Sequence, residues 1–271
     1  VFKIRHKNIY RIFKRSNCFF LFISACVIEN VSDISSWEYE CEEEMFINGV
    51  RVSCPKEHGK LNLETALVNS CNCAFALVSE QIGGKRLAKY AQQLGVLSSV
   101  QFDGITTAAG NIESADQADV LVAWSAIGQH KDLINPASFL TLVGAIANGG
   151  VAKQIYLVDK IQTGATTTYQ ANQDDVKRLM STETALKLQK LMRNNVENYY
   201  GDENFAGFSV CAKSGTAQVG GDQKPNAMFT GFVMDEGYPL AFIVTIEDGG
   251  YGRLTCVPVL EKVLAACRDI L

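Results

Sequence analysis

Two short motifs carry the residue types that an acyl-transfer site needs. Ser70-Cys71-Asn72 combines a hydroxyl with a side-chain amide, and a Lys-Ser-Gly-Thr run lies 143 residues later, at 213–216. A serine hydroxyl is a poor nucleophile at its ordinary pKa, so a base must take its proton. A lysine can do so where burial and a neighbouring cation lower its pKa. Each motif is weak alone, but their order and separation single out these candidates: Ser70, Asn72, Lys213, Ser214, Gly215 and Thr216.

Lys3 is a further candidate. The chain begins Val1-Phe2-Lys3, which reads as a Ser-x-x-Lys motif without its serine, although Lys3 would also fit a basic leader segment. A complete Ser-x-x-Lys match occurs at 53–56. We set that match aside because it follows a hairpin signal and because Pro55 is unsuited to the inside of a helix.

The apolar pattern predicts the elements that would position these side chains. Residues 63–78 read as two helical pieces joined at Ser70-Cys71-Asn72, and Lys213 lies on the first of three strands. The other predictions are helices at 84–94, after Asn135-Pro136, at 181–196 and at 257–271, with strands at 152–161, 205–219, 228–234 and 240–247. This order predicts an α+β fold, with an antiparallel sheet flanked by helices and a mainly helical subdomain.

Composition excludes one class of partner. Hydrophobic residues make up 47% of the 271, which is typical of a globular chain with a sizeable core. The formal net charge of −4 provides no basic surface for nucleic acid, so we expect no nucleic-acid partner.

The nine cysteines form no evident disulfide framework, since an odd number leaves at least one unpaired. Cys41 and Cys54 flank a hairpin signal at Asn48-Gly49, where a regular ladder would make them diagonal neighbours roughly 7–8 Å apart. A disulfide needs about 3.5–4.5 Å between Cβ atoms, so it would require a bulge or bend. Cys54 with His58, together with Cys71-x-Cys73, is too sparse a set to predict zinc, and we expect no metal or cofactor.

Residues 1–30 differ from the rest of the chain. A basic stretch at 5–15 precedes an apolar run at 18–28, which is shorter than the ~20 residues of a membrane-spanning helix. This order is typical of a secretory leader, and Cys26 even fits a lipoprotein cleavage box. The alternative is a core helix joined to an aberrant insert. We divide the chain into an aberrant or leader-like segment at 1–30, with the end of the Ser-x-x-Lys motif, and a domain at 31–271.

Together these features resemble the transpeptidase domain of a penicillin-binding protein of the high-molecular-weight, peptidoglycan-synthesising kind. The resemblance is carried by residues 61–67, 70–72, 123–129, 135–137, 145–150 and 213–217. It implies a serine transpeptidase or β-lactamase-like fold whose sheet is incomplete through truncation. In that family about ten residues lead from Ser-x-x-Lys to a motif like Val27-Ile28-Glu29-Asn30, whereas 26 lead from Lys3 to Glu29. Residues 5–22 therefore look like an insertion or a translation error.

The resemblance also implies roles for the catalytic candidates. Lys3 would be the base, and Ser70 would relay a proton to the leaving amine. Asn72 would hold the substrate amide and orient Lys3. Lys213 would supply positive charge that keeps Lys3 neutral and attracts the substrate carboxylate.

Three residues beside Lys213 would bind the acyl donor. The hydroxyls of Ser214 and Thr216 would hydrogen-bond its carboxylate. Gly215 would let it lie along the strand edge as an added strand. The backbone N–H of Thr216 would be one oxyanion donor, and the nucleophile's own N–H would be the second.

The function implied is a penicillin-binding D,D-transpeptidase that cross-links peptidoglycan stem peptides ending in D-Ala-D-Ala through a serine acyl-enzyme. β-Lactams would inhibit the intact protein covalently, and other cell-wall synthesis proteins could be partners. The parent would be anchored in the bacterial cell membrane with this domain outside. Because no serine precedes Lys3, we expect the chain to be inactive. The alternatives are a non-catalytic scaffold that binds stem peptides, and a β-lactamase or β-lactam sensor.

Overall fold

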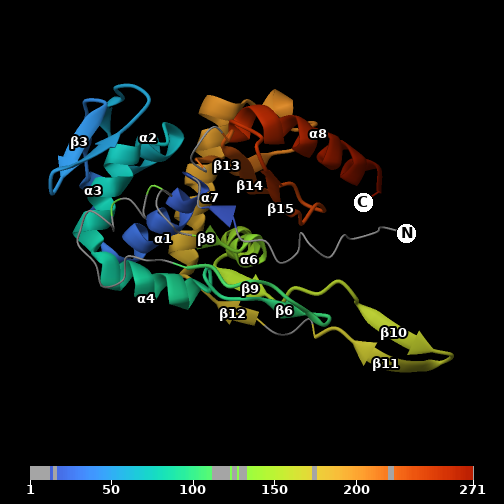
Figure 1. Ribbon diagram of the computed structural model, residues 1–271. Helices are drawn as coiled ribbons and strands as arrows, with labels where there is room; N and C mark the ends of the chain where they lie inside the picture. Colours follow the sequence, from blue (N-terminus) through green and yellow to red (C-terminus); the bar gives the residue numbers. More distant parts are fainter. Residues whose placement is uncertain are drawn as a thin grey trace.

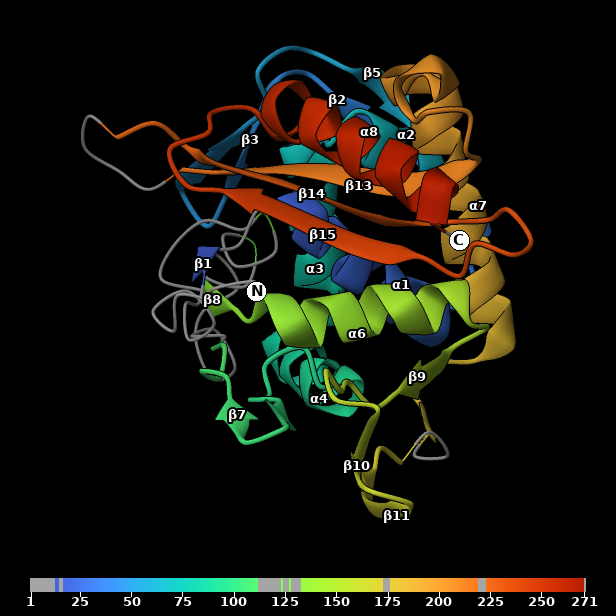
Figure 2. The same ribbon diagram turned by 90° about the vertical axis from the view of Figure 1, so that its right-hand side faces the viewer.

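The structure, a computed structural model, describes residues 13–14, 17–111, 123, 127, 133–172, 176–218 and 223–270. A three-stranded antiparallel sheet, in the order β13-β14-β15, confirms the predicted run of consecutive strands. Its strands are β13 (Val210–Ala217), β14 (Asn226–Val233) and β15 (Ala241–Ile246). Helix α8 (Gly252–Ile270) lies across one face of this sheet (Figure 2), as expected of the last helix, although it begins before residue 257 and contains Pro258.

Helices cover the other face of the sheet. Helix α6 (Pro136–Ala147) packs against β14 and β15, and α7 (Thr182–Asn195) packs against β13. Helix α6 begins as predicted, because the Asn135 side chain accepts a hydrogen bond from the backbone of Ala137.

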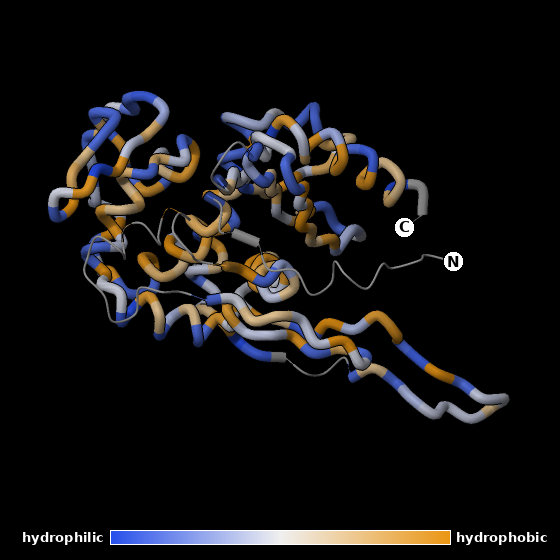
Figure 3. The backbone as a smooth tube through the Cα atoms, in the orientation of Figure 1, coloured by the Kyte–Doolittle hydropathy of each residue, from blue (hydrophilic) through white to orange (hydrophobic). Residues whose placement is uncertain are grey.

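Helix α1 (Phe20–Asn30) packs against α7, α3 (Asn72–Ile82) and α4 (Gly84–Leu94). It is hydrophobic along most of its length (Figure 3), and residues 20–27 are all buried. Glu29 at its end accepts a hydrogen bond of 2.7 Å from the backbone of Ser181, which ties α1 to the start of α7. Residues 18–27 therefore belong to the core, which is the core-helix alternative that the sequence left open.

The predicted break in the helix around Ser70 is confirmed. Helix α2 (Leu63–Val68) begins with a capping box between Asn62 and Thr65, and α3 (Asn72–Ile82) begins after Cys71. Helix α4 (Gly84–Leu94) follows and ends, as expected, at Gly95 in the left-handed conformation. These three helices form the helical side of the molecule (Figure 1).

Two small antiparallel pairs pack beside α3. Strands β3 (Glu44–Ile47) and β4 (Val50–Ser53) form the predicted hairpin, while β2 (Tyr39–Cys41) pairs with β5 (Gly59–Leu61). Cys41 therefore faces Gly59 and does not continue the β3–β4 ladder, so the diagonal arrangement with Cys54 expected of a regular ladder is wrong. The chain bends at Glu43, whose φ is +76°, and the sulfurs of Cys41 and Cys54 lie 3.9 Å apart without a bond.

The predicted strand at 152–161 is wrong as a single element. Strand β9 (Val151–Lys153) pairs with β12 (Val176–Arg178), whereas β10 (Lys160–Thr163) pairs with β11 (Thr166–Gln170) in an exposed hairpin that projects from the molecule (Figure 1). This segment forms two separate strands because its two halves pair with different partners.

The remaining elements are η1 (Asn17–Phe19), η2 (Ile34–Ser36), η3 (Val196–Tyr200), η4 (Asp202–Asn204), β1 (Phe13–Lys14), β6 (Gln101–Phe102), β7 (Ile105–Thr106) and β8 (Leu133–Ile134). None of the described helices meets the length and apolarity needed to cross a bilayer.

Candidate active site

Ser70 and Lys213 meet across the boundary between the helices and the sheet. Lys213 Nζ donates a hydrogen bond of 2.5 Å to Ser70 Oγ, although the two residues are 143 positions apart. Ser70 lies in the turn between α2 and α3, and Lys213 lies in the middle of β13. The structure therefore brings the two motifs into contact.

Lys213 is a buried cation with few partners. Its side chain is fully buried, and its amine also donates to the backbone oxygen of Ser214 at 3.0 Å. Burial lowers its pKa from 10.5 to about 8, since desolvation disfavours the charged form. The amine of Lys213 thus directs its positive charge at the Ser70 hydroxyl.

The turn that presents Ser70 is set by local sequence. Ser70 has a φ of +51°, an uncommon conformation for a residue other than glycine. Its N–H donates to the backbone oxygen of Leu67, and the next residue, Cys71, caps α3 by accepting from the backbone of Ala74. The end of α2 and the start of α3 thus hold the backbone turn from which the Ser70 side chain projects.

Asn72 is the first residue of α3, and only one end of its side-chain amide has a hydrogen-bond partner. Its Nδ2 donates to the backbone oxygen of Ser53 at 2.9 Å. Its Oδ1 is buried and has no hydrogen-bond partner among the described residues. A buried acceptor without a donor is costly, so this oxygen is available to a substrate N–H or to a lysine. Its predicted partner Lys3 lies outside the described residues.

The side chains next to Lys213 on β13 follow the alternation of a strand, so Ser214 and Thr216 lie on the face opposite Lys213. Ser214 is held by Tyr200, whose hydroxyl donates to Ser214 Oγ at 2.9 Å and accepts from the Ser214 N–H at 2.8 Å. Thr216 Oγ1 accepts from the backbone of Gly252 at 3.3 Å. Both hydroxyls proposed to bind the substrate carboxylate thus already have partners within the protein.

Tyr200 is a site residue that the sequence reasoning missed. It comes from the π-helical turn η3, and its ring is buried against Phe229. No motif identifies it, because it reaches Ser214 only through the packing of η3 on β13.

Gly215 lies where the sheet meets α8. It pairs with Met228, and a Cβ at Gly252, the first residue of α8, would collide with the carbonyl oxygens of both. Glycine at 252 therefore lets the helix start directly on β13, beside the residues that would bind the substrate.

The segment beside Lys213 is η1 with the start of α1. Cys18 Sγ donates to the backbone oxygen of Lys213 at 3.3 Å, and the Phe20 ring centroid lies 6.0 Å from Lys213 Nζ. Counting back about ten residues from Glu29 reaches Phe19 and Phe20, so the spacing expected from the resemblance would put the end of a Ser-x-x-Lys motif there. The Asn17-Cys18-Phe19-Phe20 run beside Lys213 contains neither serine nor lysine.

Two cavities lie elsewhere in the described part of the molecule. One of about 460 Å³ is lined by the end of α4 and by β9, and one of about 880 Å³ lies between α6 and residues 233–241. Neither cavity is lined by Ser70 or Lys213. The candidate active site is therefore identified by the contact between these two side chains and not by a cavity.

Comparison with known proteins agrees with this geometry. The family model of the penicillin-binding protein transpeptidase domain matches residues 23–265. Peptidoglycan D,D-transpeptidase PbpA of Mycolicibacterium smegmatis is 27% identical over 222 residues, which cover 76% of this chain and 44% of that protein. Stage V sporulation protein D of Bacillus subtilis is 24% identical over 233 residues, which cover 80% of this chain and 36% of that protein. The chain spans less than half the length of these two relatives.

Solved structures share the fold. The penicillin G acyl-enzyme complex of penicillin-binding protein A from M. tuberculosis has a TM-score of 0.83 at 20% identity, covering 96% of this chain and 63% of that one. The predicted antiparallel sheet flanked by helices is therefore confirmed. Since the family model extends over most of the sequence, the chain belongs to the penicillin-binding protein transpeptidase domain family.

Proposed function

We propose that this domain comes from a peptidoglycan D,D-transpeptidase that acts on stem peptides ending in D-Ala-D-Ala through a serine acyl-enzyme. The observation that carries the proposal is the 2.5 Å contact between Ser70 Oγ and Lys213 Nζ, buried between the helices and the sheet. In this contact Lys213 places its positive charge on the hydroxyl that would relay the proton.

In the active form, a serine hydroxyl would attack the carbonyl carbon of the penultimate D-Ala. Its proton would pass to a lysine of the Ser-x-x-Lys motif and through Ser70 to the leaving D-Ala amine. Lys213 would attract the carboxylate of the donor peptide, and Asn72 Oδ1 would accept from its amide. Ser214, Gly215 and Thr216 would bind the donor along β13, with the Thr216 N–H as an oxyanion donor. β-Lactams would acylate the same serine.

We further propose that the present chain does not form an acyl-enzyme. Asn17 to Phe20 packs beside Lys213, where the nucleophile and its base would be required. The chain would then retain Ser70 and Lys213 without the nucleophile and the base with which they would act. In the cell, the complete parent would be anchored to the membrane with this domain outside, together with other cell-wall synthesis proteins.

Restoring the motif tests both parts of the proposal. The double variant Asn17→Ser with Phe20→Lys, incubated with a fluorescent penicillin and separated on a denaturing gel, should give a covalently labelled band. Asn17→Ser alone, which supplies a hydroxyl without its base, should label little, and the unaltered chain should not label. Thermal unfolding of each variant checks that the new lysine leaves the domain folded.

The result can contradict the proposal in two ways. A labelled band on the unaltered chain would place the nucleophile elsewhere. A folded double variant without label would show that residues 17–20 do not replace the motif. Binding of stem peptides by the unaltered chain, without labelling of the double variant, would favour the scaffold alternative. Rapid turnover of a chromogenic cephalosporin by the double variant would favour the β-lactamase alternative.

A further inference from the structure

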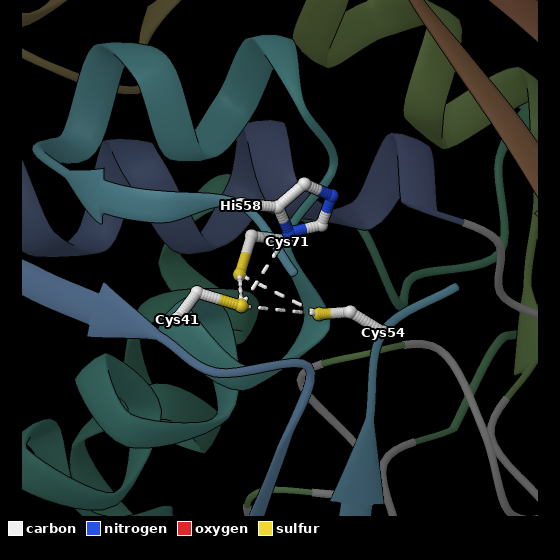
Figure 4. Close-up of side chains that lie close together, drawn as sticks. All are labelled: Cys41, Cys54, His58 and Cys71. Carbon is white, nitrogen blue, oxygen red and sulfur yellow. Dashed lines mark hydrogen bonds between the residues drawn. The ribbon is translucent and has the colours of Figure 1, made fainter. Parts of the chain in front are cut away.

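Three thiols and one imidazole converge where the small strands meet the start of α3, and their side chains point toward one another (Figure 4). Cys41 ends β2, Cys54 follows β4, His58 precedes β5, and Cys71 is the N-cap of α3. All four ligand atoms lie within 4.8 Å of one another. The sequence interpretation considered Cys54 and His58 with Cys71-x-Cys73 and found that set too sparse for zinc. Cys41, which the bend at Glu43 brings to the others, was not part of that set.

We propose that Cys41, Cys54, His58 and Cys71 bind one structural zinc ion. With Zn–S bonds of about 2.3 Å and a Zn–N bond of about 2.0–2.1 Å, tetrahedral ligand atoms lie about 3.8 Å (S to S) and about 3.6 Å (S to N) apart. The sulfur of Cys41 lies 3.9 Å from that of Cys54 and 3.5 Å from that of Cys71. The Cys54 and Cys71 sulfurs lie 3.5 Å apart, and Cys41 Sγ lies 3.5 Å from His58 Nδ1.

The surroundings suit a closed site. The three cysteines are buried, and four protein ligands leave no open position for water or substrate. The Ala74 N–H donates to Cys71 Sγ at 3.4 Å, and the His58 N–H donates to the backbone oxygen of Cys41 at 3.2 Å. Hydrogen bonds of this kind hold metal-binding residues in position.

A fourth thiol lies next to the site without joining it. Cys73 Sγ lies 3.6 Å from Cys54 Sγ, but its proton is directed at the backbone oxygens of Val52 and Glu43, at 3.5 and 3.7 Å. It is a buried cysteine of the same segment, and it therefore provides a matched control.

The position of the zinc site would connect it to the candidate active site. Cys71 lies directly between Ser70 and Asn72 in the chain. A metal that holds Cys71 would also hold the turn in which Ser70 has its positive φ, and with it the direction of the hydroxyl toward Lys213. This consequence rests on the proposed function, whereas the metal site itself does not.

Metal analysis tests the site without relying on activity. The full chain, purified under reducing conditions without chelator, should contain about one zinc per chain by mass spectrometry of the metal. Replacing zinc with cobalt(II) should give thiolate-to-cobalt charge-transfer absorption and intense d–d bands, as expected of a tetrahedral site with thiolate ligands. This measurement uses the unaltered chain, so it does not depend on the folding of a variant.

Variants then assign the ligands. Cys41→Ser and Cys71→Ser should each lose most of the bound metal, whereas Cys73→Ser and Cys256→Ser should keep it. The proposal is overturned if the unaltered chain binds neither zinc nor cobalt. It is overturned equally if Cys41→Ser and Cys71→Ser keep the full metal content, or if intact mass shows Cys41, Cys54 or Cys71 in a disulfide and no metal.

Discussion

The two sides of the Ser70–Lys213 contact differ in how much of the family's chemistry they keep. On the sheet side, Lys213 lies on a regular strand, is fully buried and reaches Ser70. On the helix side, Asn17 to Phe20 packs just as closely, but it presents an aromatic ring to the lysine amine. Lys213 and residues 18–20 are all buried, so a helix can fill its place in the core without carrying the reactive groups.

The largest expected effect comes from removing the Lys213 cation in the variant whose Ser-x-x-Lys motif has been restored. In the Asn17→Ser, Phe20→Lys background, Lys213→Met should lower the rate of labelling by fluorescent penicillin by about 10²–10⁴-fold, as for the loss of a group that assists proton transfer. Lys190→Met, which changes an exposed lysine of α7, should leave the rate unchanged. Equal rates for the two variants would mean that Lys213 has no part in acylation.

Packing on the helix side is tested by shortening Phe20. Its ring is buried and stacks on Phe75 with centroids 3.9 Å apart, so Phe20→Ala should cost about 3–5 kcal/mol of unfolding free energy. Phe46→Ala provides the matched control, because Phe46 is 63% exposed and should change stability by less than about 0.5 kcal/mol. Denaturant unfolding measures both values. A small loss of stability in Phe20→Ala would mean that the packing of α1 contributes little to the core.

The buried lysine should also appear in the pH dependence of stability. Below pH 8, Lys213 is protonated in both the folded and the unfolded chain, and between pH 8 and 10.5 only the unfolded chain retains its proton. Stability of the unaltered chain should therefore rise with pH in this interval relative to Lys213→Met, by up to about 3 kcal/mol. Parallel unfolding curves of the two proteins measure this difference. A constant difference would mean that burial does not lower the pKa of Lys213.

The smallest expected effect concerns the residue that holds Ser214. Tyr200→Phe leaves the N–H and hydroxyl of Ser214 without their partner, which should cost about 1–3 kcal/mol. Tyr199→Phe alters an exposed neighbour and should be close to neutral. Unfolding free energies compare the two variants. Equal values would mean that water replaces the Tyr200 hydroxyl.

Local signals predicted the elements well where one segment determines its own structure. Asn135-Pro136 predicted the start of α6, and small polar residues predicted the break between α2 and α3. The strand at 152–161 was wrong because its halves pair with different partners, which no periodicity within the segment reveals. Tyr200 and the approach of Cys41 to Cys71 depend on packing between distant segments, so sequence spacing could not reveal them.

The sequence by itself determined which residues could do chemistry, because residue types and motif order are properties of the chain. It identified Ser70, Asn72 and the run at 213–216 before any coordinates. Only the tertiary structure decided that Lys213 meets Ser70 and that Phe20 lies beside Lys213. The physical reason is that a contact between residues 143 positions apart forms only when helices and sheet bury their apolar faces against each other.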